Sequence, residues 1–128
     1  MRYITPRKAA SGLGASHTGT EHHWFMTVSA VALAILTPAF LLVAGRAIAL
    51  PRPEVLLYFS KPYPAIVTGL FLAVGMIHFM RGTRIMIDDY FRGTARKVGL
   101  IVADIFGWAL IACGLFALAR MSLATVLV

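Results

Sequence analysis

The chain has 128 residues, of which 59% are hydrophobic and only 13% are charged. This apolar content lies well above that of soluble globular domains and excludes a water-soluble catalytic domain. The formal net charge of +7 would suit nucleic acid, but the basic residues stand at the ends of apolar runs without a stacking platform. We therefore do not expect nucleic-acid binding.

Three long apolar runs predict the fold. Residues 24–45 and 62–80 contain no Asp, Glu, Lys or Arg, and residues 98–119 contain only Asp104. A hydrocarbon core of about 30 Å needs roughly 20 helical residues, so each run is long enough to cross a bilayer. Because lipid offers the backbone no hydrogen-bond partners, we expect an all-α integral membrane protein with three transmembrane helices.

The first 19 residues are rich in Gly, Ser and Thr, and we expect them to form an irregular tail before the first helix. Thr20 is the expected N-cap of that helix, with Glu21 in the first turn, where a carboxylate suits the helix dipole. The membrane domain is predicted over residues 20–121, with spans at about 24–46, 65–90 and 97–120, and residues 122–128 form the C-terminal end.

Prolines interrupt the connection between the first two runs, at positions 51, 53, 62 and 64. Since proline breaks regular helices, only a short helical turn from Glu54 to Phe59 is expected there.

The Lys and Arg residues that flank the spans predict the topology. Eight lie on the side of the tail and of the connection after the second run, and four lie on the other side. This excess places the N-terminus in the cytoplasm and the C-terminus outside. The eight are Arg2, Arg7, Lys8, Arg81, Arg84, Arg92, Arg96 and Lys97, and the four are Arg46, Arg52, Lys61 and Arg120.

His78 lies deep in the second apolar run, where ionisable residues are costly and usually face the protein interior or a cavity. Gly82, Ile85 and Asp89 follow it at +4, +7 and +11, so these four residues share one helix face. Asp89 is about 16 Å from His78 along the axis. If Asp89 marks the cytoplasmic interface, His78 lies near the bilayer midplane.

The chemistry available to His78 depends on what it meets there. A neutral imidazole has one donor and one acceptor, and hydrocarbon satisfies neither, so a partner from another chain or a cofactor is expected. Gly82 removes a side chain one turn away, which lets a porphyrin approach the helix closely, as an axial haem ligand requires. An interhelical hydrogen bond without a cofactor is the alternative, and the spacing alone does not decide.

The cytoplasmic end of this run is polar. Arg84, Asp88 and Arg92 are spaced i, i+4, i+8 and predict a ladder of ion pairs on the helix surface. Tyr90 suits an aromatic belt at headgroup depth, and its hydroxyl could also donate to a quinone carbonyl. Asp104, in the third run, is expected to pair with an Arg of the second helix or to face water.

A metal site built from protein side chains alone is not expected. His17, His22 and His23 lie near one another in the sequence, but no acidic cluster accompanies them. Cys113, the single cysteine, lies inside the third run and is expected to pack there as a small apolar residue.

The segment containing His78, Gly82, Asp89 and Tyr90 resembles the hydrophobic membrane anchor subunits of succinate dehydrogenase. The sequence GTEHHW at residues 19–24 is similar to the motif that precedes the first helix in the same family. Chain length, the three spans and the position of the His agree with the family over essentially the whole chain beyond the tail.

The resemblance implies that His78 supplies one axial ligand to haem b, and that a cytochrome b-type partner anchor subunit supplies the other. It also implies that Tyr90 hydrogen-bonds the headgroup of ubiquinone, the substrate, with Asp89 beside it. Transfer of two electrons and two protons near a wet interface suits a tyrosine and a carboxylate.

One position departs from the family pattern. Many members have an Arg, which can meet the haem propionates, where this chain has Thr27. We expect His22, Arg81 or Arg84 to provide some of that charge neutralisation instead.

The resemblance further implies a multi-pass anchor in a bacterial inner membrane, non-catalytic on its own. Flavoprotein and iron–sulfur subunits docked on the cytoplasmic face would carry out the succinate chemistry that joins the tricarboxylic acid cycle to the respiratory chain. Two alternatives remain open from the sequence. The first is the anchor of a fumarate reductase, and the second is a small proton-coupled transporter, for which Asp104 is the only candidate carboxylate.

Overall fold

The computed structural model describes residues 5–11 and 19–123, and every regular element within these ranges is a helix. In chain order they are α1 (Pro6–Ala10), α2 (Gly19–Ile48), α3 (Arg52–Phe59), α4 (Pro62–Tyr90) and α5 (Gly93–Leu123). The short helix α1 lies inside the segment that the sequence predicts to be irregular. Its first residue is a proline, which is compatible with the first helical position.

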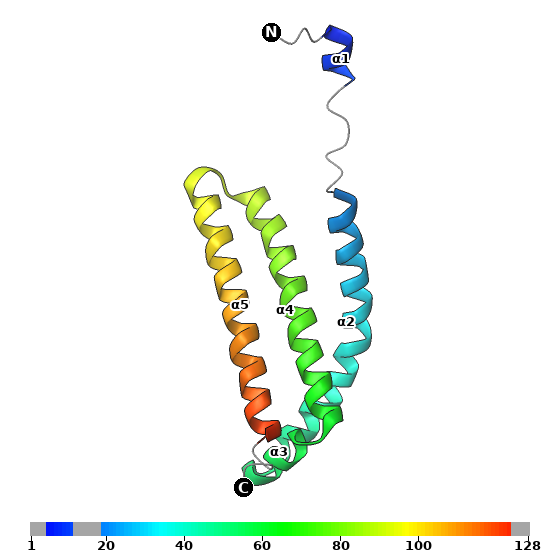
Figure 1. Cartoon of the computed structure of the whole chain (residues 1–128), viewed down its shortest axis with the longest axis vertical. Helices are drawn as coiled ribbons and strands as arrows, with labels where there is room; N and C mark the ends of the chain where they lie inside the picture. Colours follow the sequence, from blue (N-terminus) through cyan, green and yellow to red (C-terminus); the bar gives the residue numbers. More distant parts are fainter. Residues whose placement is uncertain (1–4, 12–18, 124–128) are drawn as a thin grey trace.

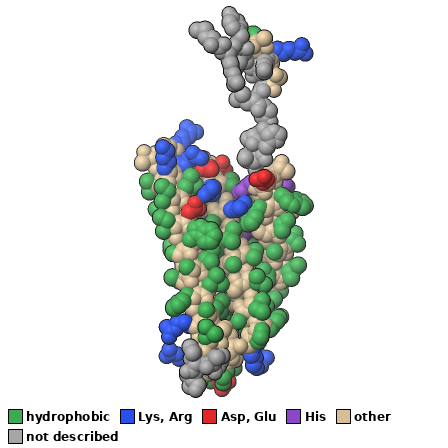
Figure 2. All heavy atoms as spheres, viewed as in Figure 1, with side chains coloured by type: hydrophobic (Ala, Val, Ile, Leu, Met, Phe, Trp, Pro, Cys, Tyr) green, Lys and Arg blue, Asp and Glu red, His purple; other side chains and the backbone are tan. Residues whose placement is uncertain are grey.

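Helices α2, α4 and α5 are long and apolar enough to cross a membrane, which confirms the three predicted spans. With 30, 29 and 31 residues they are about 43–47 Å long, so their ends extend beyond a hydrocarbon core of about 30 Å. Only 11%, 17% and 11% of the residues in their most apolar windows are buried within the chain. Figure 2 shows hydrophobic side chains over the middle of the molecule and Lys and Arg at both ends.

Helix α4 lies between α2 and α5 and packs against both, whereas α2 and α5 have no extensive contact with each other (Figure 1). The three long helices therefore form a layer rather than a closed bundle. We call the end that carries the α4–α5 connection and the first turn of α2 the turn end. The opposite end, covered by α3, is the α3 end.

The α3 end contains a small core. Ser122 donates a hydrogen bond of 3.0 Å to the carbonyl oxygen of Phe59, which ties α5 to α3. Helix α3 confirms the short helical segment predicted from Glu54 to Phe59, and it begins at Arg52 because prolines are tolerated in a first turn. The core consists of Val43, Phe59 and Val67, with Ala39, Phe40, Ala47, Val55, Tyr58, Leu118 and Met121 packed against it.

The helix boundaries differ from the predicted ones at three places. Helix α2 begins at Gly19, so Thr20 lies in its first turn and is not the N-cap. Helix α4 begins at Pro62 rather than near residue 65, again because proline fits the first turn. Helix α5 begins at Gly93 rather than near residue 97, and Gly93 has a φ of 60°, a conformation that glycine adopts without steric cost.

Two glycines allow α5 to pack closely against α4. A Cβ atom at Gly107 would overlap the side chain of Met80, and one at Gly114 would overlap the side chain of Leu72. Small residues at such positions are the usual means by which helices approach closely in lipid.

Gly114→Ala should lower the stability of the α4–α5 pair by about 1–3 kcal/mol, because the added methyl group overpacks the contact with Leu72. Gly69→Ala is the matched control, since its Cβ would lie 3.7 Å from Leu115 and 3.8 Å from Leu118, both ordinary contacts. Thermal unfolding of the protein in detergent should show a lower midpoint for Gly114→Ala than for Gly69→Ala. Equal midpoints would show that Leu72 moves aside without cost.

Candidate functional site

His78 is half-buried on α4 and faces α2. Its Nδ1 atom lies 2.7 Å from the hydroxyl oxygen of Ser29, which is itself only 5% exposed. Within the described ranges no other hydrogen bond reaches the imidazole ring. The prediction that His78 needs a partner from another chain or a cofactor is therefore wrong for Nδ1, and it stays a prediction for Nε2.

Gly82, one helical turn beyond His78, also lies beside α2. A Cβ atom at this position would lie 3.9 Å from the terminal methyl group of Met26, with no other side chain of the described residues within 4 Å. Methionine is unbranched and flexible, so this neighbour can move. The helix surface next to His78 is thus free of a fixed side chain.

The contacts to α4 come from one face of α2. His22, Phe25, Met26 and Ser29 are spaced i, i+3, i+4 and i+7, which aligns them along that face. The guanidinium carbon of Arg81 lies 3.8 Å from the centre of the Phe25 ring, in cation–π geometry. The first three turns of α2 therefore contact α4 at His78, Arg81 and Gly82.

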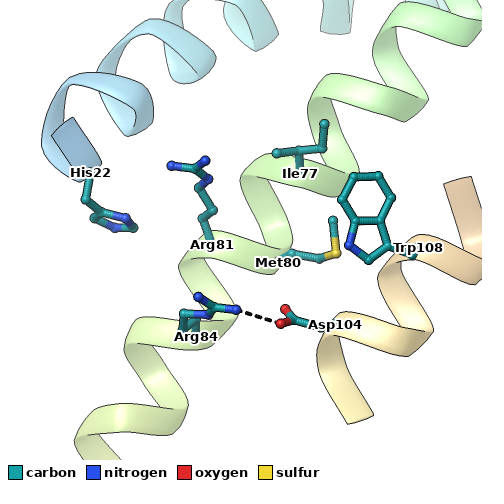
Figure 3. A pocket seen from close by; sticks show the side chains of 7 residues that line it. All are labelled: His22, Ile77, Met80, Arg81, Arg84, Asp104 and Trp108. Atoms are coloured by element: carbon teal, nitrogen blue, oxygen red, sulfur yellow. Dashed lines mark hydrogen bonds and ion pairs between the residues drawn. The ribbon is translucent and has the colours of Figure 1, made fainter. Parts of the chain in front are cut away.

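A pocket of about 340 Å³ opens among α2, α4 and α5 towards the turn end (Figure 3). In Figure 3 the imidazole of His22 lies on the α2 side, and Met80 and Trp108 lie close together on the other side. The pocket brings together the three residues that the sequence predicts for the haem propionates. Its lining residues are His22, Ile77, Met80, Arg81, Arg84, Asp104 and Trp108.

Arg84 is already paired in this pocket. Its terminal nitrogen lies 2.6 Å from a carboxylate oxygen of Asp104 on α5, the contact drawn as a dashed line in Figure 3. This ion pair confirms the prediction that Asp104 pairs with an Arg of the second span. The positive charge of Arg84 is therefore largely balanced within the chain.

The ion-pair ladder predicted along α4 is wrong. Helix α4 ends at Tyr90, so Arg92 does not lie one turn beyond Asp88 on the same helix. Asp88 instead accepts a 2.7 Å hydrogen bond from Arg96 of α5, which the short α4–α5 connection brings alongside it. Asp88 and Asp104 thus each form an ion pair that joins α4 to α5, rather than a pair within one helix.

Two polar groups of the pocket have no such partner. The Nε2 atom of His22 is buried and has no hydrogen-bond partner among the described residues. Arg81 makes the contact with the Phe25 ring but no ion pair within the described ranges. An unsatisfied buried nitrogen costs about 1–3 kcal/mol, so a polar or anionic group that entered the pocket would be favoured.

Asp89 and Tyr90 lie apart from this pocket, in the last turn of α4. Both are exposed, Tyr90 to 82%, and neither has a hydrogen-bond partner within the described ranges. The backbone amide of Phe91 donates a hydrogen bond of 2.9 Å to the carbonyl oxygen of Ile87, and the helix ends there, at Tyr90. Tyr90 is about 18 Å from His78 along the axis, so the structure holds two separate positions rather than one site.

Metal ligation by side chains alone has no support among residues 5–11 and 19–123, where no three His, Cys, Asp or Glu residues are grouped. His17 lies outside the described residues. Cys113 is exposed on α5 rather than packed within the chain.

Ser29 and Phe25 are contacts of the site that the sequence does not single out. The available signal is weak: a serine inside an apolar run must find a polar partner, and it lies seven residues after His22 on the same helix face. Which face of α2 meets α4 depends on tertiary packing, and hence the pairing with His78 is visible only in the structure.

Comparison with known proteins identifies the family of the chain. A family model for succinate dehydrogenase/fumarate reductase transmembrane subunits matches residues 1–119. The succinate dehydrogenase hydrophobic membrane anchor subunit of Paracoccus denitrificans is 61% identical over 128 residues, which are 100% of this chain and 99% of that protein. No solved structure shows a significant match. The chain therefore belongs to the family of succinate dehydrogenase/fumarate reductase transmembrane subunits, among the hydrophobic membrane anchor subunits of succinate dehydrogenase.

Proposed function

We propose that this chain and a second, cytochrome b-type anchor subunit tether the flavoprotein and iron–sulfur subunits of a succinate:ubiquinone oxidoreductase to the bacterial inner membrane. The open layer of three apolar helices supports this, since it leaves large apolar faces for lipid and for another subunit. The distribution of Lys and Arg supports a cytoplasmic N-terminus and an outside C-terminus. The soluble partners then dock at the turn end.

The observation that carries the haem part of the proposal is the setting of His78. One ring nitrogen is hydrogen-bonded to Ser29, while Nε2 has no partner in the described chain, and beside Gly82 only the flexible side chain of Met26 approaches the helix surface. These residues fit haem b, whose iron would be held by His78 and by a histidine of the second anchor subunit. When bound, the haem supplies a one-electron carrier within the membrane.

The pocket at the turn end offers groups for the haem propionates. His22 and Arg81 are the better candidates, because Arg84 is paired with Asp104. Thr27 does not line this pocket, and its hydroxyl donates to the carbonyl oxygen of His23 at 3.0 Å. The charge that many relatives place at that position is thus supplied here from α4, by Arg81.

Tyr90 and Asp89 form the quinone part of the proposal. A phenol that is exposed at the end of α4 can donate a hydrogen bond to a quinone carbonyl, and a neighbouring carboxylate can hold a proton. Their exposure suits a site completed by the partner subunits. This chain alone has no dehydrogenase activity, since the succinate chemistry belongs to those partners.

The experiment that tests the proposal is purification of the native complex through an affinity tag on this chain. We expect flavin, iron–sulfur centres and haem b in constant ratio, together with succinate-dependent reduction of ubiquinone. Recovery of the chain without flavin would contradict the tether. Faster fumarate reduction than succinate oxidation would indicate the fumarate reductase anchor instead. The transporter alternative gains no support, because Asp104 is paired with Arg84.

A further inference from the structure

Three polar atoms surround the hydroxyl group of Ser29. Its oxygen lies 2.7 Å from the carbonyl oxygen of Phe25, 3.2 Å from that of Met26 and 2.7 Å from Nδ1 of His78. Because Ser29 is only 5% exposed, the hydroxyl exchanges hydrogen bonds with these groups rather than with bulk solvent. Which group donates in each hydrogen bond then follows from which of these groups carries a proton.

A serine hydroxyl has one proton and two lone pairs, and a carbonyl oxygen has no proton to give. The close contact with the Phe25 oxygen is therefore a hydrogen bond that Ser29 donates, with the Met26 oxygen sharing the same proton. Only lone pairs remain for His78, so Nδ1 must donate in the 2.7 Å contact. In the neutral imidazole this leaves Nε2 with a free lone pair.

We infer that Ser29 is a positioning residue for haem ligation. It holds His78 in the tautomer that carries its proton on Nδ1, and it fixes the rotation of the ring, so that Nε2 presents its lone pair to the iron. The inference rests on the proposed function and deepens it. An acceptor on the outer nitrogen also raises the electron donation of an imidazole ligand, which favours ferric over ferrous iron.

Ser29→Ala in the intact complex tests this role. We expect haem to be retained, because His78 is unchanged, and the haem midpoint potential to rise. The ferrous-to-ferric ratio at a fixed potential should increase by up to about tenfold, which is ~59 mV for a one-electron couple. The electron paramagnetic resonance signal of the ferric haem should shift as well, since the ring loses its rotational restraint.

Two further variants separate this role from general packing. Thr27→Ala removes another hydroxyl of α2, one that is exposed and bonded only to the backbone of His23, and it should leave the potential at the wild-type value. Ser29→Thr keeps a hydroxyl at the critical position and should restore both the potential and the resonance signal.

An unchanged midpoint potential and resonance signal in Ser29→Ala would overturn the inference about Ser29. The proposed function would still stand in that case, provided that the complex contains haem. A wild-type complex without haem would instead overturn the haem part of the proposed function. If Ser29→Ala does not assemble, Ser29→Cys decides, because a thiol of similar size is a weaker acceptor. A wild-type potential in Ser29→Cys would also contradict the role of Ser29.

Discussion

Replacement of His78 by alanine should abolish the haem b spectrum of the purified complex. The side chain is the ligand that we propose from this chain, and no other histidine lies on the second half of α4. The loss should not come from a collapsed helix pair. Ser29 keeps the Phe25 carbonyl as its acceptor when the imidazole is removed, so no buried donor is left unsatisfied and the lost hydrogen bond costs about 1 kcal/mol.

The measurement is the reduced-minus-oxidised spectrum, normalised to the flavin that co-purifies. His23→Ala is the matched control, since His23 is exposed in the first turns of α2 and its side chain has no hydrogen bond within the described ranges. It should retain full haem. A His78→Ala complex with an unchanged spectrum would show that the ligand is another residue, and the interhelical hydrogen bond would then be the whole role of His78.

Much of the fold could be predicted from the sequence because bilayer thickness sets a length that uncharged runs must meet. The three spans follow from that rule without tertiary information. The ends were harder to predict, since proline and glycine break a helix interior but are accepted at its first turn, as at Pro62 and Gly93. Helix α2 likewise begins at Gly19, one residue before the predicted N-cap Thr20, because residue preferences alone do not locate the exact start of a helix.

The site could be predicted only in part. His78 stands out because an ionisable group in an apolar run is costly, and this can be recognised from the sequence of a single helix. The partner Ser29 depends on which faces of α2 and α4 meet, and so do the contacts of Phe25 with Arg81. Helical spacing places residues on a face but does not state what that face touches.

The ion pairs of α4 could not be predicted from helical spacing either, and the predicted ladder is wrong. Asp88 has basic residues at the expected spacing on either side, yet it pairs with Arg96, and Arg84 pairs with Asp104. Both observed partners lie on α5, which the two-residue connection folds back against α4. Pairing across helices therefore replaced pairing along one helix.

Tyr90→Phe should lower ubiquinone reduction at least tenfold while succinate oxidation with an artificial dye persists. Loss of one hydrogen bond to the bound quinone of about 1.4 kcal/mol accounts for a factor of ten, and a proton-transfer role would add to it. The Tyr90 hydroxyl has no hydrogen-bond partner in the described part of the chain, and the ring is 82% exposed. Removal of the oxygen should therefore leave the stability of the anchor unchanged.

Tyr63→Phe is the matched control, because Tyr63 is an exposed tyrosine of the same helix at the α3 end, far from the proposed quinone position. It should leave both activities unchanged. The ratio of quinone to dye reduction separates the possible causes. A fall in both activities for Tyr90→Phe would indicate a defect of assembly, and no change in either would remove Tyr90 from the quinone site. A fall in quinone reduction alone would place the reaction at the exposed end of α4, next to Asp89, rather than in the pocket lined by His22 and Arg81.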